Sequence, residues 1–340
     1  MILTKREAEI LAAIVEIYVD TAQPVGSQTV IAARGLSLSP ASVRATMAVL
    51  TEKGYVLQPH TSAGRVPSVQ GFRYYLDQVL RFSPLSRREQ SRLQDHILPG
   101  TVELPETLRR AAAALASLTR QLCVITAPRH DLARWRHIDF VLLHPGRVMA
   151  VLVMHGGLVS NRVLDVDTTL DRDELLYYSN YLNSLLEGRT TSEVRQEIIR
   201  QLRSAQQTLD AYGQAWELAE QAIATDDQPE LFVGGASHLT DHPEFTDLTT
   251  LHRVLELIEE RTRLLELLDK TQSSPVVSVS LGQDMPDLLG CSLVASAYSA
   301  HATTHGSLAV LGPVRMNYAR ILPMVDFAAQ VLSQCLTSRF

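Results

Sequence analysis

Residues 39–67 constrain the fold of this chain more than any other segment. Ser39 can accept a hydrogen bond from a free amide of a first helical turn, and Pro40 suits the first helical position because it lacks an amide proton. The next apolar side chains recur at helical spacing and would face a core: Val43, Met47 and Leu50. Gly54 then supplies the helix stop. The pattern predicts a short helix with one buried face.

The opposite face of this predicted helix is small and polar, and it carries Ser42, Arg44, Ala45 and Thr46. Small hydrogen-bonding side chains with one guanidinium allow a helix to sit in the DNA major groove, which is about 12 Å wide, and to reach base edges. The pattern therefore predicts a recognition helix. Its predicted DNA-binding residues are Ser39, Ser42, Arg44 and Thr46, and Ser42 and Arg44 are the candidates for reading bases.

Residues 55–67 predict a strand, a polar turn and a return of the chain. The strand covers residues 55–58, and the chain returns through Val66 to Pro67. The turn offers hydroxyls, backbone amides and a guanidinium, which are typical phosphate contacts that position a protein on a duplex without reading its sequence. This pattern predicts a wing, with these DNA-binding residues: His60, Thr61, Ser62 and Arg65.

Two more helices upstream favour DNA binding over the alternative that the capped helix and the polar loop are ordinary surface features. Thr4 and Glu7 form the two ends of a capping box. Apolar side chains then repeat at helical spacing, at Ile10, Leu11, Ile14, Val15 and Tyr18. Ser27 can cap a second helix that ends before Gly35. The predicted order is helix, helix, turn, recognition helix, strand and wing.

The charge distribution agrees with this placement, although the formal net charge of the whole chain is −6. Residues 1–90 contain 10 Lys and Arg against 7 Asp and Glu, which gives +3. The remaining residues contain 21 against 30, which gives −9. A mildly basic N-terminal part predicts DNA binding through few phosphate contacts, with a symmetric partner and a steep dependence on salt.

The rest of the chain predicts helices and antiparallel strands, and hence an α+β fold. The predicted helices are 69–82, 108–123, 171–186, 193–224, 251–268 and 318–336. The predicted strands are 137–143, 147–154, 158–165, 231–233, 276–281, 292–298 and 307–312. Pro145-Gly146 and Gly156-Gly157 join the first three strands as hairpin turns, so we expect an antiparallel meander there.

Other classes of function have little support in the sequence. The chain lacks an apolar run of about 18 residues and an apolar N-terminal stretch, so we expect a cytoplasmic protein with no membrane partner. Cys123, Cys291 and Cys335 have no paired spacing for zinc or a disulfide framework. Ser237 and His238 are adjacent, but they lack the G-x-S-x-G pattern of a hydrolase. We expect no enzyme activity, no cofactor and no metal.

Six segments carry a family pattern, and they lie in both halves of the chain. They are LTKREAEILAAIVEIYVDTAQPVGS from residue 3, SPASVRATMAVL from 39, PHTSAGRVPS from 59, GFRYYLD from 71, LFVGGASHLTDHPEF from 231 and GSLAVLGPVRMNYARI from 306. Together they resemble the heat-inducible transcription repressor HrcA family. The family usually has asparagine where this chain has Ala45, and an acidic residue where it has Thr51.

The resemblance implies a repressor of heat-shock (chaperone) genes that binds double-stranded DNA as a homodimer, at an inverted-repeat operator, and is released on heat stress. It also implies a GroE-type chaperonin as the partner that keeps the repressor active. For the fold it implies an N-terminal winged helix-turn-helix, then a GAF-like antiparallel α/β domain with an inserted, mostly helical dimerisation domain. We place the winged helix-turn-helix domain at residues 1–84, the GAF-like domain at 100–167 with 273–340, and the inserted dimerisation domain at 168–272.

An alternative function is a ligand-sensing or protein-interaction module whose helix-turn-helix is only a scaffold. Such a module would bind a small molecule or a partner, but it would show no salt-sensitive binding to duplex DNA. The resemblance favours the repressor, and the residue patterns alone leave the module open.

Overall fold

The computed structural model of this chain describes residues 3–35, 38–60, 63–98, 104–128, 134–154, 159–166, 170–205, 212–223, 229–271, 277–282, 290–300 and 304–339. It is a mixed structure of helices and antiparallel sheets, in agreement with the predicted α+β class. Two compact units are present: Met1–Ile125 with Phe232–Ala297 and Leu308–Ala329, and Thr126–Leu231 with Tyr298–Ser307 and Gln330–Phe340. No helix among the described residues is long and apolar enough to cross a membrane.

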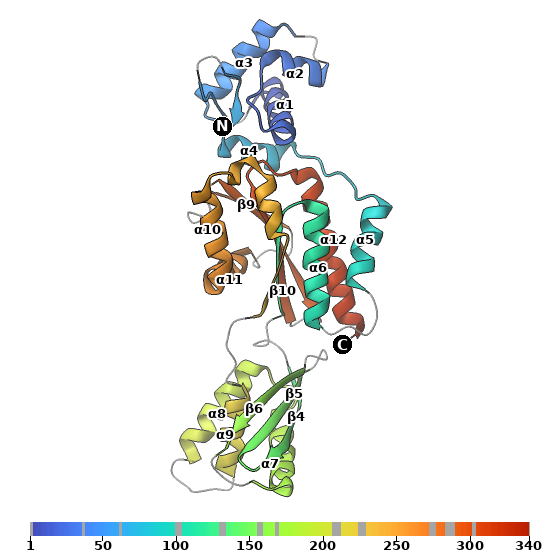
Figure 1. Cartoon of the computed structure of the whole chain (residues 1–340), viewed down its shortest axis with the longest axis vertical. Helices are drawn as coiled ribbons and strands as arrows, with labels where there is room; N and C mark the ends of the chain where they lie inside the picture. Colours follow the sequence, from blue (N-terminus) through green and yellow to red (C-terminus); the bar gives the residue numbers. More distant parts are fainter. Residues whose placement is uncertain are drawn as a thin grey trace. The chain divides into compact units, whose positions relative to one another are not determined.

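Three helices with a shared core begin the first unit (Figure 1): α1, Lys5–Thr21; α2, Ser27–Arg34; and α3, Pro40–Glu52. The predicted capping box of α1 is confirmed, because Thr4 Oγ1 accepts from the Glu7 amide at 3.3 Å and Glu7 accepts from the Thr4 amide at 2.8 Å. The fully buried side chains of this core are Ile10, Leu11, Ile14, Val30, Val43 and Leu50. Ser27 is not the cap of α2, because Gly26 takes the N-cap position and Ser27 is the first helical residue.

A two-stranded sheet follows α3. Its strands are β1, Val56–Leu57, and β2, Val66–Pro67, which pair antiparallel. Gly54 has a φ of 79° between α3 and β1, which confirms it as the helix stop. After β2 come α4, Val69–Tyr74, and the π-helical turn η1, Tyr75–Val79, so the helix predicted over 69–82 ends before Leu80. We call residues 3–80 the head.

Two helices and a strand come next in the first unit. α5, Arg87–Ile97, lies between the predicted domain segments 1–84 and 100–167, and it packs against α6, Leu104–Thr119. α6 ends where Arg120 adopts a left-handed conformation with a φ of 56°, and β3, Leu122–Thr126, begins two residues later. The helix predicted over 108–123 therefore starts four residues too late and ends four residues too late, because a short apolar run is typical of both a buried strand and a buried helix.

β3 belongs to a five-stranded sheet with the order β7-β3-β10-β9-β8. The other strands are β7, Leu231–Gly234; β8, Ser278–Leu281; β9, Cys291–Ala300; and β10, Thr304–Pro313. β3 pairs antiparallel with β10, and β8 with β9. All five residues of β3 are buried, so the sheet is covered on both faces there. The last helix, α12, is Tyr318–Arg339, and its Arg320 Nε donates to Glu89 of α5 at 3.0 Å.

Four helical segments lie between β7 and β8. They are the 3-10 helices η2, Ala236–Asp241, and η3, Pro243–Phe245, followed by α10, Leu248–Glu259, and α11, Arg261–Thr271. The sequence predicts one helix over 251–268. Glu260 leaves the helical conformation with φ −77° and ψ 72°, so the segment forms two helices that pack on each other.

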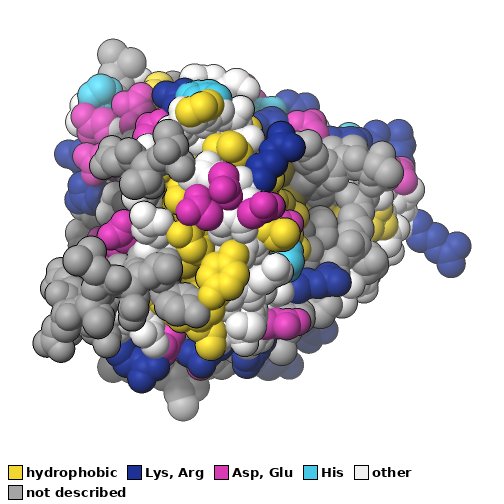
Figure 2. Space-filling view, turned by 90° about the horizontal axis from the view of Figure 1, so that it is seen from below, with side chains coloured by type: hydrophobic (Ala, Val, Ile, Leu, Met, Phe, Trp, Pro, Cys, Tyr) yellow, Lys and Arg dark blue, Asp and Glu magenta, His cyan; other side chains and the backbone are white. Residues whose placement is uncertain are grey.

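The second unit contains the predicted meander, which is confirmed. β4, Trp135–His144, β5, Arg147–Met154, and β6, Val159–Asp165, form an antiparallel sheet in that order. Its helices are α7, Arg172–Leu186; α8, Thr191–Ala205; and α9, Tyr212–Ile223. Apolar side chains also reach the surface, since Leu176 and Tyr177 of α7 are 58% and 49% exposed. The face seen from below in Figure 2 shows hydrophobic side chains among charged ones.

The second unit crosses the boundary that the sequence placed at residue 168. The meander was expected in the GAF-like domain and α7–α9 in the insertion, yet they share one hydrophobic cluster around Trp135, Leu182 and Trp216. α10 and α11, expected in the insertion, lie in the first unit. A small sheet must bury its apolar face against another layer, and here α7–α9 supply that layer.

Candidate nucleic-acid interface

α3 presents small side chains to solvent and apolar ones to the core of the head. Val43, Met47 and Leu50 are at most 4% exposed, as the spacing predicts. Exposed residues that recur at helical spacing include Ala41, Arg44, Ala45 and Ala48, and the two end residues of α3, Pro40 and Glu52, are exposed as well. Alanines around one arginine let a helix approach a groove closely, and they offer methyl groups for contact with thymine.

Hydrogen bonds hold the N-terminal turn of α3. Ser39 Oγ accepts from the Ser42 amide at 3.2 Å, which confirms Ser39 as the cap and Pro40 as the first helical residue. Arg44 is exposed, and its Nε donates to the Pro40 carbonyl oxygen at 3.3 Å. Ser39 is exposed and Ser42 is half-buried. Three of the predicted side chains thus come together at the N-terminal end of α3.

Thr46 does not belong to this exposed face, although the sequence placed it there. Its side chain is only 9% exposed, and its Oγ1 donates to the Ser42 carbonyl oxygen at 3.2 Å within the helix. Thr46 lies three residues after Val43 and four before Leu50, so helical spacing turns it toward the core. The structure therefore contradicts the predicted exposure of Thr46 on this face of α3.

The returning side of the predicted wing is bound to the turn between α1 and α2. The Val25 amide donates to the Arg65 carbonyl at 2.8 Å, and the Arg65 amide donates to the Val25 carbonyl at 2.9 Å. Gly64 allows this approach, because a Cβ at that position would lie 2.4 Å from the Val25 oxygen. The half-buried Arg65 side chain donates from Nε to Thr51 Oγ1 at 2.9 Å. Arg65 is therefore held against α3.

The wing loop is closed by one of its own side chains, since Gln58 Nε2 donates to the Ala63 carbonyl oxygen at 3.3 Å. His60 is exposed in this loop. The two predicted hydroxyl residues, Thr61 and Ser62, lie outside the described residues. His60 and Arg65 are therefore the predicted wing residues whose surroundings the structure describes.

Two residues of α1 contact α3, and no local pattern predicts either contact. Arg6 Nη2 donates to the Ser42 carbonyl oxygen at 3.1 Å and also to Ser42 Oγ. Glu7 pairs with Lys53 at 2.7 Å. The first contact joins residues 36 positions apart and the second joins residues 46 positions apart, so neither leaves a short-range signal in the sequence.

Glu7 is an ionised anchor between these two helices. The hydrogen bond from Lys53, and then the one from the Thr4 amide, lower the pKa of Glu7 below its ordinary value of 4.5. The Glu7 side chain is 11% exposed and that of Lys53 is 25% exposed. Glu7 is ionised at neutral pH, and its pair with Lys53 holds the start of α1 against the end of α3.

Comparison with known proteins identifies the family. A family model described as the HrcA protein C terminal domain matches residues 105–322. A heat-inducible transcription repressor HrcA of Nitratidesulfovibrio vulgaris (strain DSM 19637 / Miyazaki F) is 43% identical, with coverage of 99% of this chain and 97% of the relative. The relative of the same name from Syntrophobacter fumaroxidans is 35% identical, with coverage of 98% and 97%. The chain belongs to the HrcA family.

Membership in the HrcA family confirms the predicted class of function. The relatives are named heat-inducible transcription repressors, which agrees with a negative regulator of the transcription of heat-shock genes. A crystal structure described as that of a hypothetical protein at 2.2 Å resolution is 21% identical and has a TM-score of 0.65, with coverage of 99% of both chains. That likeness shows a shared fold.

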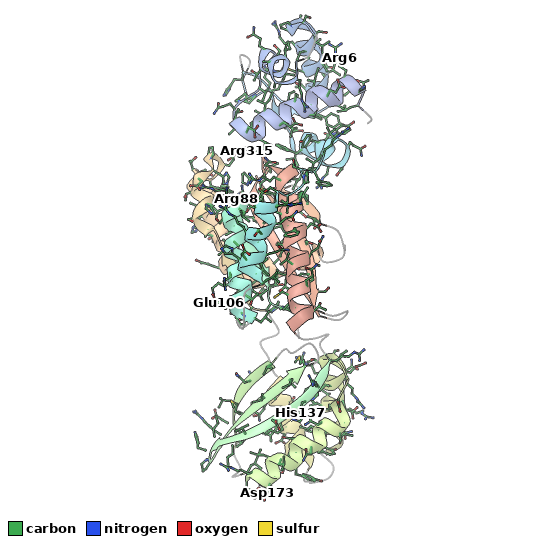
Figure 3. The ribbon with its side chains drawn as sticks, turned by 90° about the vertical axis from the view of Figure 1, so that its right-hand side faces the viewer. Arg6, Arg88, Glu106, His137, Asp173 and Arg315 are labelled. Atoms are coloured by element: carbon green, nitrogen blue, oxygen red, sulfur yellow. The ribbon has the colours of Figure 1, made fainter. Side chains whose placement is uncertain are left out.

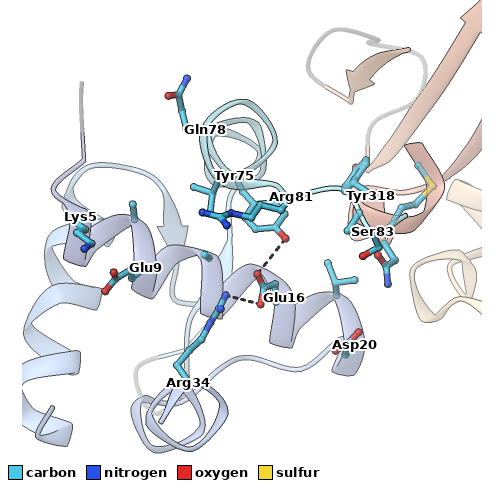
Figure 4. A pocket seen from close by; sticks show the side chains of 17 residues that line it. Lys5, Glu9, Glu16, Asp20, Arg34, Tyr75, Gln78, Arg81, Ser83 and Tyr318 are labelled. Atoms are coloured by element: carbon cyan, nitrogen blue, oxygen red, sulfur yellow. Dashed lines mark hydrogen bonds and ion pairs between the residues drawn. The ribbon is translucent and has the colours of Figure 1, made fainter. Parts of the chain in front are cut away.

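A charged cleft of about 960 Å³ runs along α1 (Figure 4). It is lined by α1, by η1 and by the turn before α12. Glu16 in its wall accepts from Arg34 at 2.6 Å and from the Tyr75 hydroxyl at 3.4 Å. Burial, followed by the charge of Glu16, raises the pKa of Tyr75 to about 12.

Arg315, in the family motif that begins at residue 306, ties α1 to the rest of the first unit. It pairs with both carboxylate oxygens of Glu244, with Nη2 at 3.1 Å from Oε2, and its Nη1 donates to the Val19 carbonyl oxygen at 3.2 Å. α1 has no basic residue in its last turn, so Arg315 supplies the cation that a helix C-terminus favours. The motif forms the turn before the last helix, and its contact with α1 was not predicted.

Proposed function

We propose that the head is a winged helix-turn-helix that binds double-stranded DNA, and that the protein represses transcription through this contact. α2 and α3 would be the two helices of the motif, and the loop between β1 and β2 would be its wing. The observation that carries the proposal is the exposed face of α3, with its alanines around Arg44. This face fits the major groove, whereas bulky side chains would keep a helix out.

In this proposal the N-terminal end of α3 enters the groove, as recognition helices do. Arg44 and Ser42 read base edges, and guanine is the base that arginine contacts most often. Ser39, exposed at the start of the helix, lies where it can meet the flanking backbone. The wing contributes contacts to the backbone or the minor groove from His60, Thr61, Ser62 and Arg65.

We also propose that two copies pair through the outer face of the β4–β6 sheet, which is the face opposite the hydrophobic cluster. Along β5, buried side chains alternate with the half-exposed Met149, Val151 and Val153. Val141 and Val163 flank Met149 in register and are 43% and 52% exposed. A sheet face in water normally carries polar side chains, so an apolar outer face favours a covered surface.

A second copy of the chain suits this outer face because the polar groups on it carry both signs. Arg147 pairs with Asp165 at 2.7 Å, and His137 lies 3.3 Å from Asp139. Two copies related by a two-fold axis can therefore place opposite charges against each other. A homodimer has two heads, and two heads match an inverted repeat whose half-sites are about 34 Å apart.

For the rest of the molecule we propose a GAF-like domain built on the five-stranded sheet, and a GroE-type chaperonin as the modulating partner. The antiparallel pairs β3–β10 and β8–β9 support the first proposal. The family resemblance supports the second. Purified chaperonin with ATP should raise the fraction of repressor that binds duplex, and excess unfolded client protein should lower it again. A fraction that responds to neither addition would contradict the chaperonin proposal.

Binding of a fluorescent inverted-repeat duplex tests the DNA assignment. Arg44→Ala should cost about 1–3 kcal/mol of binding free energy through a lost base contact. Arg65→Ala should weaken binding more uniformly across sequences. Light scattering should give the same dimer mass for both variants and the wild type. Unchanged affinity in both variants contradicts DNA binding through the head, and a clean monomer of 37.6 kDa contradicts the dimer.

A further inference from the structure

Arg6 joins the first turn of α1 to the N-terminal end of α3. Its Nη2 donates to the Ser42 carbonyl oxygen at 3.1 Å and to Ser42 Oγ, and the residue is nevertheless exposed. Figure 3 labels Arg6 on the head. One edge of the guanidinium is thus bound to a candidate base-reading residue, and the remainder of the side chain reaches solvent.

The position of Arg6 is fixed by its neighbours on both helices. Thr4 caps α1, and Glu7, the next residue after Arg6, is paired with Lys53. Lys53 is the C-cap residue of α3, whereas Ser42 lies in the first turn of that helix. The first turn of α1 is therefore bound to both ends of α3, and a side chain mounted on two rigid elements keeps its geometry before a ligand arrives.

Arg6 retains hydrogen-bond donors for a further partner. A guanidinium carries five N–H donors in a planar fork, and both bonds to Ser42 use Nη2. In the part of the chain that the structure describes, Nε and Nη1 of Arg6 have no hydrogen-bond acceptor. The adjacent carboxylate of Glu7 is bound by Lys53. A fork of this kind matches the oxygens of a phosphate group.

We propose that Arg6 binds a backbone phosphate of the operator beside the N-terminal end of α3, and that it sets the direction in which Ser42 reads a base. The inference rests on the proposed function, because it requires α3 in the major groove. Phosphates line both edges of that groove, and the N-terminal residues of a recognition helix contact the bases. A guanidinium beside that end meets the strand that flanks the contacted bases.

The bond from Arg6 restricts what Ser42 can recognise. A serine hydroxyl has one proton and two lone pairs, and Arg6 donates to the oxygen. One lone pair is then occupied, and the proton is free to point toward the groove. Ser42 can therefore donate to a hydrogen-bond acceptor, which in the major groove is N7 or O6 of guanine, N7 of adenine or O4 of thymine, and it keeps one lone pair for a donor. Arg6 acts as a phosphate ligand and as the positioning residue for Ser42.

The test compares Arg6→Ala and Arg6→Lys with a matched control, Arg88→Ala, which removes an exposed arginine from α5. Binding of the full-length protein to an inverted-repeat duplex is measured over a range of salt concentrations. Arg6→Ala should weaken binding roughly tenfold, and the slope of log K against log salt should fall by about 1 for each lost contact. Arg6→Lys should keep most of the slope and still bind more weakly, because lysine lacks the fork. Arg88→Ala should match the wild type.

A double-mutant cycle with Ser42→Ala tests the positioning role. If Arg6 directs the hydroxyl, Ser42→Ala should weaken binding severalfold in the wild type and much less in the Arg6→Ala background. Equal effects of Ser42→Ala in the two backgrounds overturn this role. Thermal unfolding of each variant shows whether the head remains folded, and Arg6→Lys provides the comparison if Arg6→Ala does not.

The failure of this inference can be distinguished from the failure of the proposed function. Wild-type affinity and slope in Arg6→Ala, together with weakened binding in Arg44→Ala, overturn the role of Arg6 alone. Weaker binding with an unchanged salt slope overturns the phosphate contact. Wild-type binding in both Arg6→Ala and Arg44→Ala overturns the proposed function, and the inference with it.

Discussion

The head and the β4–β6 sheet with α7–α9 have similar interiors and different surfaces. Both pack helices on a small antiparallel sheet around fully buried side chains, such as Leu50 in the head and Leu182 in α7. On the head, the exposed face of α3 carries alanines around Arg44. On the sheet, the outer face carries the exposed Val141 and Val163.

In our proposal, the two surfaces bind different partners, and they do so through different kinds of interaction. Duplex DNA is a polyanion, so its binding requires cations in fixed positions and weakens with salt. A second copy of the chain brings the same apolar face, and burial of that face contributes about 25 cal/mol per Å² with little dependence on salt. In this proposal one chain separates DNA binding from pairing into two regions, and variants in either region can test the separation.

The largest effects should come from matched cavities in the two cores. Leu50→Ala and Leu182→Ala should each cost about 2–5 kcal/mol of unfolding free energy, because both side chains are fully buried. Leu50→Ala should lower duplex affinity and leave the dimer mass unchanged, whereas Leu182→Ala should weaken the dimer first. Calorimetry, duplex titration and light scattering measure these effects. Equal losses of both properties in both variants would contradict the separation.

A charge on the outer sheet face should break pairing. Val163→Glu places a carboxylate on the proposed interface, and the expected result is dimerisation weaker by roughly 100-fold, because unpaired or like charges at an interface cost several kcal/mol. Duplex affinity should fall as the dimer dissociates. Val233→Glu on β7, where the valine is 37% exposed, is the matched control and should keep the dimer. Sedimentation of both variants measures their oligomeric state, and a stable Val163→Glu dimer contradicts this interface.

A smaller effect should follow from moving the wing. Gly64→Ala forces the chain away from Val25, because the added Cβ would lie 2.4 Å from the Val25 oxygen. Duplex affinity should fall roughly tenfold, or about 1.4 kcal/mol, with no change in dimer mass. Gly26→Ala is the control, since its Cβ would meet only Thr29 Oγ1 at 3.7 Å. If both variants bind alike, the wing plays no part in binding.

The smallest effect concerns neither surface and depends on pH. Hydrogen bonds from the Ser86 hydroxyl and amide, and then from Arg320, lower the pKa of Glu89 from 4.5 to about 2. The ionised form stabilises the folded chain above pH 4.5, and this contribution is lost as the pH falls toward 2. Glu89→Gln should therefore destabilise the protein at pH 6 and approach the wild type near pH 2. Thermal unfolding at several pH values measures this, and a difference that is constant with pH would contradict it.

Short-range chemistry made much of the fold predictable. The Ser39-Pro40 start and the Gly54 stop defined α3, and the turn at Pro145-Gly146 defined the first hairpin of the meander. In each case the signal is a residue that a cap or turn requires, next to side chains with one clear period. The face of α3 followed from the same period, except that Thr46 lies at the edge of its buried side.

The long-range contacts could not be predicted from the sequence. β3 is buried on both faces, so its apolar run carries no alternation to distinguish it from the end of α6. The break at Glu260 lies in a segment whose helical period continues across it. Arg6 with Ser42, and Arg315 with Val19, join residues that only the folded chain brings together. The residues that α3 contributes to the candidate site were therefore predictable from the sequence. The residues that α1 contributes were not.

Selection of bound duplexes from a random pool tests the central claim most directly, with the wild type and Val163→Glu run side by side at a stated salt concentration. The wild type should enrich one inverted repeat, and Val163→Glu should enrich at most a single half-site. No enrichment by the wild type would contradict DNA recognition by the head. Enrichment of the same inverted repeat with equal affinity by both proteins would contradict pairing through the sheet.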